Sequence, residues 1–358
     1  MSFKAQDARL LKVVSRQDTN IYELGSGKFR NKFFIITGPG SRKLLSTPEL
    51  VGFPCYTALL DETVAALNFL VSAGRGGDFD ILTILRGGLN YPLEEACSRC
   101  GIRVRDMHFV SCERIIENHE IKGLEIKYEK LRPTRDRVVA IGDILASGAT
   151  FRMCMDYFVK EFHLRGGSIR RIVFFTIGGT KAIDILEELT PCLQKLFPGF
   201  EGFDCFFYEG AFTVYEGPGV SGINVKDIDF GWNGGVVAPE FRELVMDRPD
   251  ALLEKCIIYD GGARRYEIPL HIEEVCEYWE GILERADIID PKALVQEKLG
   301  YEGPLDYEAW MQVTRMPEGH KELWKKEQDY LAAAQTLDLG AIARKRLDSM
   351  QSLSNLYK

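Results

Sequence analysis

The feature that most constrains the fold is a series of short, mostly apolar strands separated by segments with helical spacing. Five predicted strands lie at 80–85, 105–112, 137–141, 171–177 and 203–208. The predicted helices between them include 150–162 and 181–189. Strands without polar alternation that are separated by helices are typical of a parallel sheet covered on both faces. The sequence therefore predicts an α/β protein with a Rossmann-like core and right-handed crossover connections.

Two stretches flank this core, and we expect the chain to divide into residues 1–77, 78–235 and 236–358. The first stretch has a turn at 24–28, a strand at 33–37 and a helix at 57–73. We interpret it as an N-terminal hairpin and hood. The last stretch consists of helix-forming segments punctuated by prolines. It predicts a helical C-terminal region, and no chemical motif can be assigned to it.

Charge and hydropathy exclude several classes of partner. The net charge of −8 disfavours general binding to nucleic-acid backbones. No apolar run approaches the about 18 residues of a membrane helix, and the N-terminus lacks the apolar core of a secretory signal. We therefore expect a cytoplasmic protein that binds a small molecule and has neither a membrane nor a general nucleic-acid partner. A homodimer is the candidate assembly.

The nine cysteines are scattered and odd in number, which does not predict a disulfide framework. We expect most of them to be reduced core residues. Cys97 and Cys100, together with His108 and Cys112, offer the sulfur and imidazole ligands of a zinc site. Packing against neighbouring strands is the favoured interpretation, because a second closely spaced pair is absent.

The segment 138–150 carries the most chemical information. An apolar strand leads to Asp143, a loop of small residues follows, and a helix begins near Thr150. At the carboxyl end of a parallel strand, such a loop lies in the ligand crevice. Its backbone N–H groups and the helix dipole favour a phosphate, and Ser147 and Thr150 can add hydroxyl hydrogen bonds. The alternative is a plain turn in which Asp143 or Ser147 caps the helix. The segment is not a Walker A loop.

This segment resembles the signature of the type I phosphoribosyltransferases, which bind 5-phosphoribosyl-1-pyrophosphate. The signature is an apolar strand, two acids, two apolar residues and a short loop with Thr/Ser-Gly-x-Thr. The resemblance implies a phosphoribosyltransferase-type core in which the loop wraps the 5′-phosphate. It also implies that Asp143 faces the ribose hydroxyls, directly or near Mg²⁺. The loop residues are Ala146, Ser147, Gly148, Ala149 and Thr150.

A second loop stands upstream, at the end of the strand 80–85. Its sequence, Ile84-Leu85-Arg86-Gly87-Gly88-Leu89, resembles the pyrophosphate loop of the same family. Two glycines let the backbone approach a diphosphate closely, and Arg86 can give charge-assisted hydrogen bonds. An Arg-Gly-Gly segment alone would predict a surface turn, but two loops in the family's order and strand context favour binding. Arg86 and Asp143 are the candidate catalytic residues.

Two weaker similarities extend the resemblance over about residues 20–235. The segment 24–28, with its Ser-Gly-Lys, is similar to the N-terminal hairpin of orotate phosphoribosyltransferases, although an ordinary hairpin turn is the favoured interpretation. The charged segment 113–136 matches the place of the family's mobile catalytic loop and predicts a long exposed hairpin or loop. Residues 236–358 lie outside the resemblance.

The chain departs from the family at two positions. Gly142 stands where the family places the first of two adjacent acids, and Ala146 stands where purine-specific members carry an acid. A purine mechanism that uses this loop acid is therefore not implied. A single acid at Asp143 also implies weaker sugar binding or a different sugar.

Recognition of the base is assigned by the resemblance to residues after the last core strand. Asp229, Phe230 and Trp232 could stack on a ring and bond its edge. The alternative is a core aromatic pair under a glycine-rich loop, and the sequence does not decide between the two.

Three functions are compatible with these residues. The favoured one is an Mg²⁺-dependent phosphoribosyltransferase that acts on a nucleobase-like acceptor, because a nucleotide sensor has less need of the loop at Arg86. The second is a non-catalytic sensor of phosphoribosyl pyrophosphate or nucleotides, with 236–358 as its output region, and Gly142 favours it. The third is cleavage of a nucleoside phosphate on the same fold.

Overall fold

The computed structural model describes residues 9–357 except 17, 26, 86, 118–119, 216, 225–229 and 256–262. Within these residues the strands form one ten-stranded sheet in the order β1-β2-β3-β9-β8-β7-β4-β5-β6, with β10 paired to β9. The strands are β1 (Arg9–Arg16), β2 (Thr19–Gly25), β3 (Lys32–Thr37), β4 (Phe79–Ile84), β5 (Val104–Glu117), β6 (Glu120–Lys130), β7 (Arg137–Leu145), β8 (Ile169–Gly179), β9 (Phe203–Val214) and β10 (Phe230–Val237).

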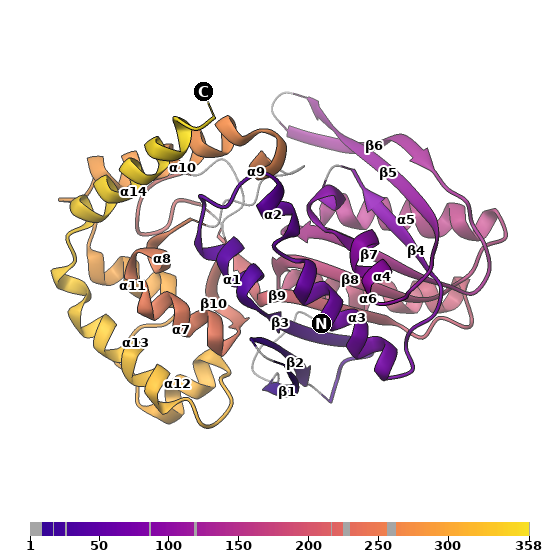
Figure 1. Cartoon of the computed structure of the whole chain (residues 1–358), viewed down its shortest axis with the longest axis horizontal. Coiled ribbons are helices and arrows are strands. Elements are labelled where there is room, and N and C mark those ends of the chain that lie inside the picture. The colour runs from indigo at the N-terminus through magenta and orange to yellow at the C-terminus, as the bar shows by residue number, and fades with distance from the viewer. Residues whose placement is uncertain are drawn as a thin grey trace.

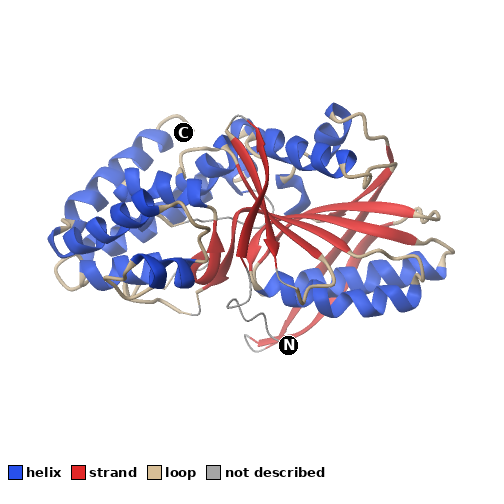
Figure 2. Ribbon diagram, turned by 90° about the horizontal axis from the view of Figure 1, so that it is seen from below, coloured by secondary structure: helices blue, strands red, loops and turns tan. Residues whose placement is uncertain are grey.

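Six neighbouring strands, from β3 through β9, β8, β7 and β4 to β5, run parallel. β4 and β9 are mostly apolar and are buried along nearly their whole length, because helices cover both sides of the sheet, as Figure 2 shows. The covering helices include α3 (Leu60–Ser72), α4 (Leu93–Arg99), α5 (Ala149–Leu164) and α6 (Lys181–Leu196). The predicted parallel α/β core is confirmed.

β4 and β7 lie side by side, but the chain leaves them in opposite directions across the sheet. From β4 it passes through α4 to β5, and from β7 it passes through α5 to β8. Because both crossovers are expected to be right-handed, opposite directions place α4 and α5 on opposite faces. The carboxyl ends of β4 and β7 therefore flank the topological switch point, where open α/β sheets bind their ligands.

Antiparallel strands extend the sheet on both sides of the parallel block. β1 and β2 continue it beyond β3, and β6 pairs with β5 to form the long hairpin that projects from the sheet in Figure 1. The hairpin predicted within 113–136 is thus confirmed for its described residues. The turn between β2 and β3 lies at the amino ends of the parallel strands, at the edge opposite the switch point. Ser26, in this turn, lies outside the described residues.

The C-terminal region is helical, as predicted, and occupies the left side of Figure 1. It follows β10, a strand that the sequence did not predict. The remaining helices of the chain are α1 (Pro39–Ser46), α2 (Phe53–Thr57), η2 (Gly87–Asn90), α7 (Pro239–Asp247), α8 (Pro249–Leu253), α9 (Ala263–Tyr266), α10 (Ile268–Glu284), α11 (Pro291–Leu299), α12 (Tyr307–Thr314), α13 (Lys321–Ala333), η3 (Ala334–Thr336) and α14 (Leu339–Ser354). Within the described residues, no helix combines the length and the apolar character needed to cross a membrane.

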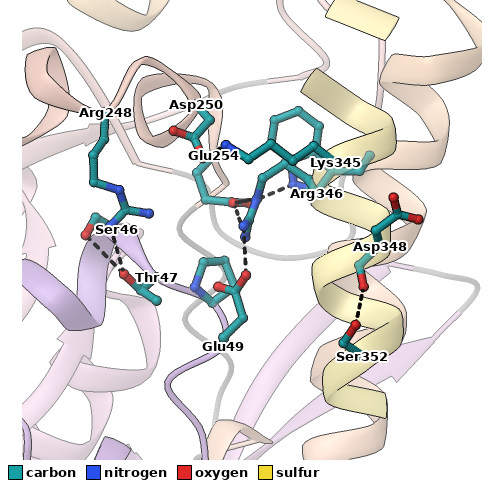
Figure 3. A network of polar contacts seen from close by, with 12 residues as sticks. Ser46, Thr47, Glu49, Arg248, Asp250, Glu254, Lys345, Arg346, Asp348 and Ser352 are labelled. Carbon is teal, nitrogen blue, oxygen red and sulfur yellow. Dashed lines mark hydrogen bonds and ion pairs between the residues drawn. The ribbon is translucent and has the colours of Figure 1, made fainter. Parts of the chain in front are cut away.

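Buried polar contacts hold the helical region against the segment around α1 and α2. Arg346 of α14 donates hydrogen bonds to Glu254 and to Glu49, as Figure 3 shows. Arg264 of α9 donates to three backbone carbonyls at and beyond the end of α1. These are carbonyls of the kind that a helix end leaves without a helical partner. The helical region is therefore packed into the hood of the core and is not a separate appendage.

Candidate functional site

The predicted acid, Asp143, lies inside β7 and not after it. The sequence placed the end of this strand at Ile141, whereas β7 continues to Leu145 and pairs with β8 as far as Gly178. The Asp143 side chain is buried, and its Oδ1 accepts a hydrogen bond from the backbone N–H of Ile144 at 2.9 Å. The longer strand carries the carboxyl group to the rim of the sheet, beside the end of β4.

The loop after β7 delivers the N-terminus of α5 to the same rim. Gly148 is the N-cap residue, with φ 75° in the left-handed region, and as a glycine it has no side chain with which to cap the helix. Asp143 and Ser147, the caps in the alternative of a plain turn, are therefore not the N-cap residue of α5. Helix starts leave their first N–H groups without helical partners, and these groups attract anions. Thr150 lies in the first turn and is half-buried, whereas Ser147 and Ala149 are exposed and Ala146 is buried.

The loop after β4 meets the loop-bearing end of β7. It forms the short helix η2, and a Cβ placed on Gly87 would lie 2.2 Å from Oδ1 of Asp143. A Cβ on Gly88 would lie 2.7 Å from Cγ2 of Thr83. A side chain at either position would therefore require its neighbour to shift. Arg86, which the sequence assigned to this loop, lies outside the described residues.

Tyr91, which follows η2, is a residue of this site that the sequence did not indicate. Its hydroxyl donates to the backbone carbonyl of Asp143 and accepts from the N–H of Ile177, both at 3.0 Å. Burial raises the pKa of Tyr91 well above its ordinary value, so the hydroxyl keeps its proton. A Cβ on Gly142 would lie 2.5 Å from two atoms of Tyr91. The contact joins residues far apart in the chain, and no local pattern could have revealed it.

The predicted base-binding residues lie on β10. Phe230 is buried against Phe212. Trp232 packs against Phe241, and the guanidinium of Arg242 lies 4.6 Å from the centroid of the Trp232 ring. Both aromatic rings line a cavity of about 40 Å³. Binding sites for small molecules are usually several hundred Å³ in volume. Base binding by Phe230 and Trp232 stays a prediction, and Asp229 lies outside the described residues.

The candidate zinc ligands turn to different partners. The Cys100 thiol donates to the carbonyl of Val64, and His108 lies 3.2 Å from Asp80 in the core. In the described part of the chain, no three His, Cys, Asp or Glu side chains are grouped to hold a metal. Cys97 is buried, and Cys100 and Cys112 are half-buried and packed against the core.

No protein-family model matches the chain, and no curated protein matches it. Solved structures similar to it include phosphoribosyltransferases. The AQ2163 protein of Aquifex aeolicus is 17% identical, with 47% of this chain and 82% of that chain covered and a TM-score of 0.31. Adenine phosphoribosyltransferase of Leishmania donovani is 16% identical, with 51% of this chain and 86% of that chain covered and a TM-score of 0.29. Hypoxanthine phosphoribosyltransferase of Staphylococcus aureus is 17% identical, with 36% of this chain and 66% of that chain covered and a TM-score of 0.26. These TM-scores are all below 0.5, so function has to be inferred from the chain's own site.

Proposed function

We propose that this protein is a phosphoribosyltransferase-like enzyme that binds phosphoribosyl pyrophosphate and transfers its phosphoribosyl group to a nucleobase-like acceptor. One observation carries the proposal. The Asp143 carboxyl group lies against Gly87 across adjacent strands at the switch point, and the loop after β7 leads from it to the N-terminus of α5 at Gly148. A carboxylate for sugar hydroxyls is thus flanked by two loops that can each receive phosphate.

The loop after β7 would hold the 5′-phosphate. The first N–H groups of α5, which have no partner within the helix, and the positive end of its dipole would supply a site for a dianion. Thr150 lies in the first turn and Ser147 just before it, so both hydroxyls can add hydrogen bonds. Gly148 is needed at its left-handed φ, which a side chain would strain.

The loop after β4 would hold the pyrophosphate. At Gly87 and Gly88 the backbone closely approaches the Asp143 side chain and β4, and Arg86 would add positive charge to the loop. The carboxyl group of Asp143 would be the protein ligand of Mg²⁺, which takes one or two carboxylates together with substrate phosphates and waters. When bound, Mg²⁺ would neutralise charge on the pyrophosphate.

The reaction would be a displacement at the anomeric carbon. The bond from this carbon to the pyrophosphate oxygen breaks, and its electron pair leaves with pyrophosphate. A bond from the carbon to a nitrogen of the acceptor forms. Positive charge develops on the sugar, as in glycoside hydrolysis. Asp143 would accept hydrogen bonds from ribose hydroxyls and so orient the ring, and Arg86 would stabilise charge on the leaving group.

The contact between Tyr91 and Gly142 favours a second candidate function, a non-catalytic sensor of phosphoribosyl pyrophosphate or nucleotides. With the Tyr91 ring in place, position 142 has no room for the first motif acid. A site with one acid can bind the ligand without turning it over. In this case the helical region, which is tied to the hood by Arg346, would carry the response.

A pyrophosphate-release assay separates the candidates. The protein is mixed with phosphoribosyl pyrophosphate, Mg²⁺ and a panel of nucleobases, and pyrophosphate is measured over time. Release that depends on one base supports the transferase. Binding of the donor without release supports the sensor, and liberation of a base from a nucleoside monophosphate supports the cleaving enzyme. Asp143→Asn should abolish release, whereas Asp156→Asn, the same change at an exposed position of α5, is the matched control.

A further inference from the structure

The hydroxyl of Tyr91 joins two strands at the residue on which the proposed site depends. β7 and β8 pair in parallel with Ile144 opposite Ile177. The Ile177 N–H donates to the Tyr91 hydroxyl, which donates to the Asp143 carbonyl. Tyr91 itself comes from the other side of the switch point, directly after η2. One side chain therefore links the loop after β4 to the backbone of the acid on β7.

The ring of Tyr91 is held in one place. It is 4% exposed, and its centroid lies 6.1 Å from that of Tyr208, which in turn stacks on Phe175. The ring cannot move away without losing this packing. Its hydroxyl, which donates to the Asp143 carbonyl, therefore holds the Asp143 backbone in position. The Asp143 carboxyl then lies so close to Gly87 that a Cβ at Gly87 would displace it.

The same ring occupies the volume that a side chain at position 142 would need. A Cβ there would lie 2.5 Å from Cβ and Cγ of Tyr91 and 3.0 Å from Cδ2. Real Cβ atoms do not approach other atoms this closely, so an acid at 142 and a tyrosine at 91 exclude each other. The absence of the first motif acid is thus coupled to a residue in the other loop.

We infer that Tyr91 is the positioning residue of this site. Tyr91 sets the Asp143 carboxyl against the loop after β4. The Tyr91 side chain itself fills the space at position 142, where the family that the chain resembles carries its first acid. The inference rests on the proposed function for its ligand, phosphoribosyl pyrophosphate. The geometry gives it two consequences. First, loss of the Tyr91 hydroxyl lowers the affinity for phosphoribosyl pyrophosphate more than it lowers stability. Second, the effects of substitutions at positions 91 and 142 on stability are strongly non-additive.

The first test compares Tyr91→Phe with Tyr208→Phe. Tyr208 is an equally buried tyrosine in the same cluster, but its hydroxyl bonds to Thr63 and not to the site. Calorimetry with phosphoribosyl pyrophosphate and Mg²⁺ should show a loss of about tenfold for Tyr91→Phe and little change for Tyr208→Phe. Both melting temperatures should fall by similar amounts. Equal affinities in the two variants would overturn the positioning role.

The second test is a cycle between positions 91 and 142. Gly142→Asp in the wild type should lower the melting temperature strongly. In a Tyr91→Gly background, which also removes the Tyr91 Cβ that lies 2.5 Å from a Cβ at position 142, the same change should cost less stability. It should also strengthen Mg²⁺-dependent binding of phosphoribosyl pyrophosphate relative to Tyr91→Gly alone. If Gly142→Asp is equally destabilising in both backgrounds, the mutual exclusion is wrong. Wild-type protein that binds no phosphoribosyl pyrophosphate would refute the proposed function, while the stability cycle still tests the coupling of positions 91 and 142.

Discussion

Glu209 is predicted to make the stability of this protein depend on pH. It lies on β9 with φ 63° and is fully buried, and its Oε1 accepts hydrogen bonds from the N–H of Gly38 and the hydroxyl of Ser41. Removal from water raises the pKa of Glu209 to about 8, and these hydrogen bonds only partly oppose the effect. The folded protein thus holds a proton that an unfolded chain has already released at neutral pH.

The sign and size of the effect follow from proton linkage. Between pH 4.5, the ordinary pKa of a glutamate, and about pH 8, the folded state binds one more proton than the unfolded state. The free energy of unfolding therefore falls as pH rises, by about 1.4 kcal/mol per pH unit. Across the whole interval this one residue removes roughly 5 kcal/mol, and above about pH 8 the loss is complete.

Urea denaturation of the wild type and of Glu209→Gln at pH 5, 6, 7 and 8 measures this contribution. The glutamine keeps the shape but cannot titrate, so the wild type should lose about 1.4 kcal/mol per pH unit relative to the variant. The exposed Glu322→Gln is the control for a change of overall charge. Parallel pH curves for wild type and Glu209→Gln would show that Glu209 ionises normally in the fold and would refute the reasoning.

Three further predictions concern single positions. Gly87→Ala places a methyl group 2.2 Å from Oδ1 of Asp143 and should weaken binding of phosphoribosyl pyrophosphate about tenfold in calorimetry, with an unchanged far-UV spectrum. Unchanged affinity would show that contact between the two loops does not matter for binding. Glu327→Ala removes the carboxylate that accepts two hydrogen bonds from the buried Arg242, and it should lower the free energy of unfolding in urea by about 3–5 kcal/mol. A loss below about 1 kcal/mol would contradict this. Gly148→Ala forces a side chain into the left-handed region and should lower the free energy of unfolding by about 1–3 kcal/mol, and a stabilised variant would count against the assigned loop geometry.

The parallel core could be predicted because its strands are apolar throughout. β4 and β8 are buried along nearly their whole length, so their sequences carry a strong signal. The end of β7 was missed because Gly142 and Asp143 interrupt the apolar run, although pairing with β8 continues past them. β10 was missed because its glycines and Asn233 hide any period of two, and its order comes from pairing with β9.

The candidate site could be predicted in its loops but not in the contacts that join them. Glycines and an acid after apolar strands are local signals, and they identified Gly87, Asp143 and Gly148. The contact of Tyr91 with Gly142 depends on which strands become neighbours, and this information is absent from any short segment. The same limit applies to Glu209, whose partners Gly38 and Ser41 lie at the start of α1, far from Glu209 in the chain.

The most direct test of the central claim is calorimetric titration of the purified protein with phosphoribosyl pyrophosphate, with and without Mg²⁺. Ribose 5-phosphate and a panel of nucleoside monophosphates are titrated in parallel. Our account predicts binding of the pyrophosphate ligand that strengthens with Mg²⁺ and is lost in Asp143→Asn, while that variant stays folded. Folded wild-type protein that binds none of these compounds would contradict the assignment of the crevice between β4 and β7 as a phosphoribosyl site.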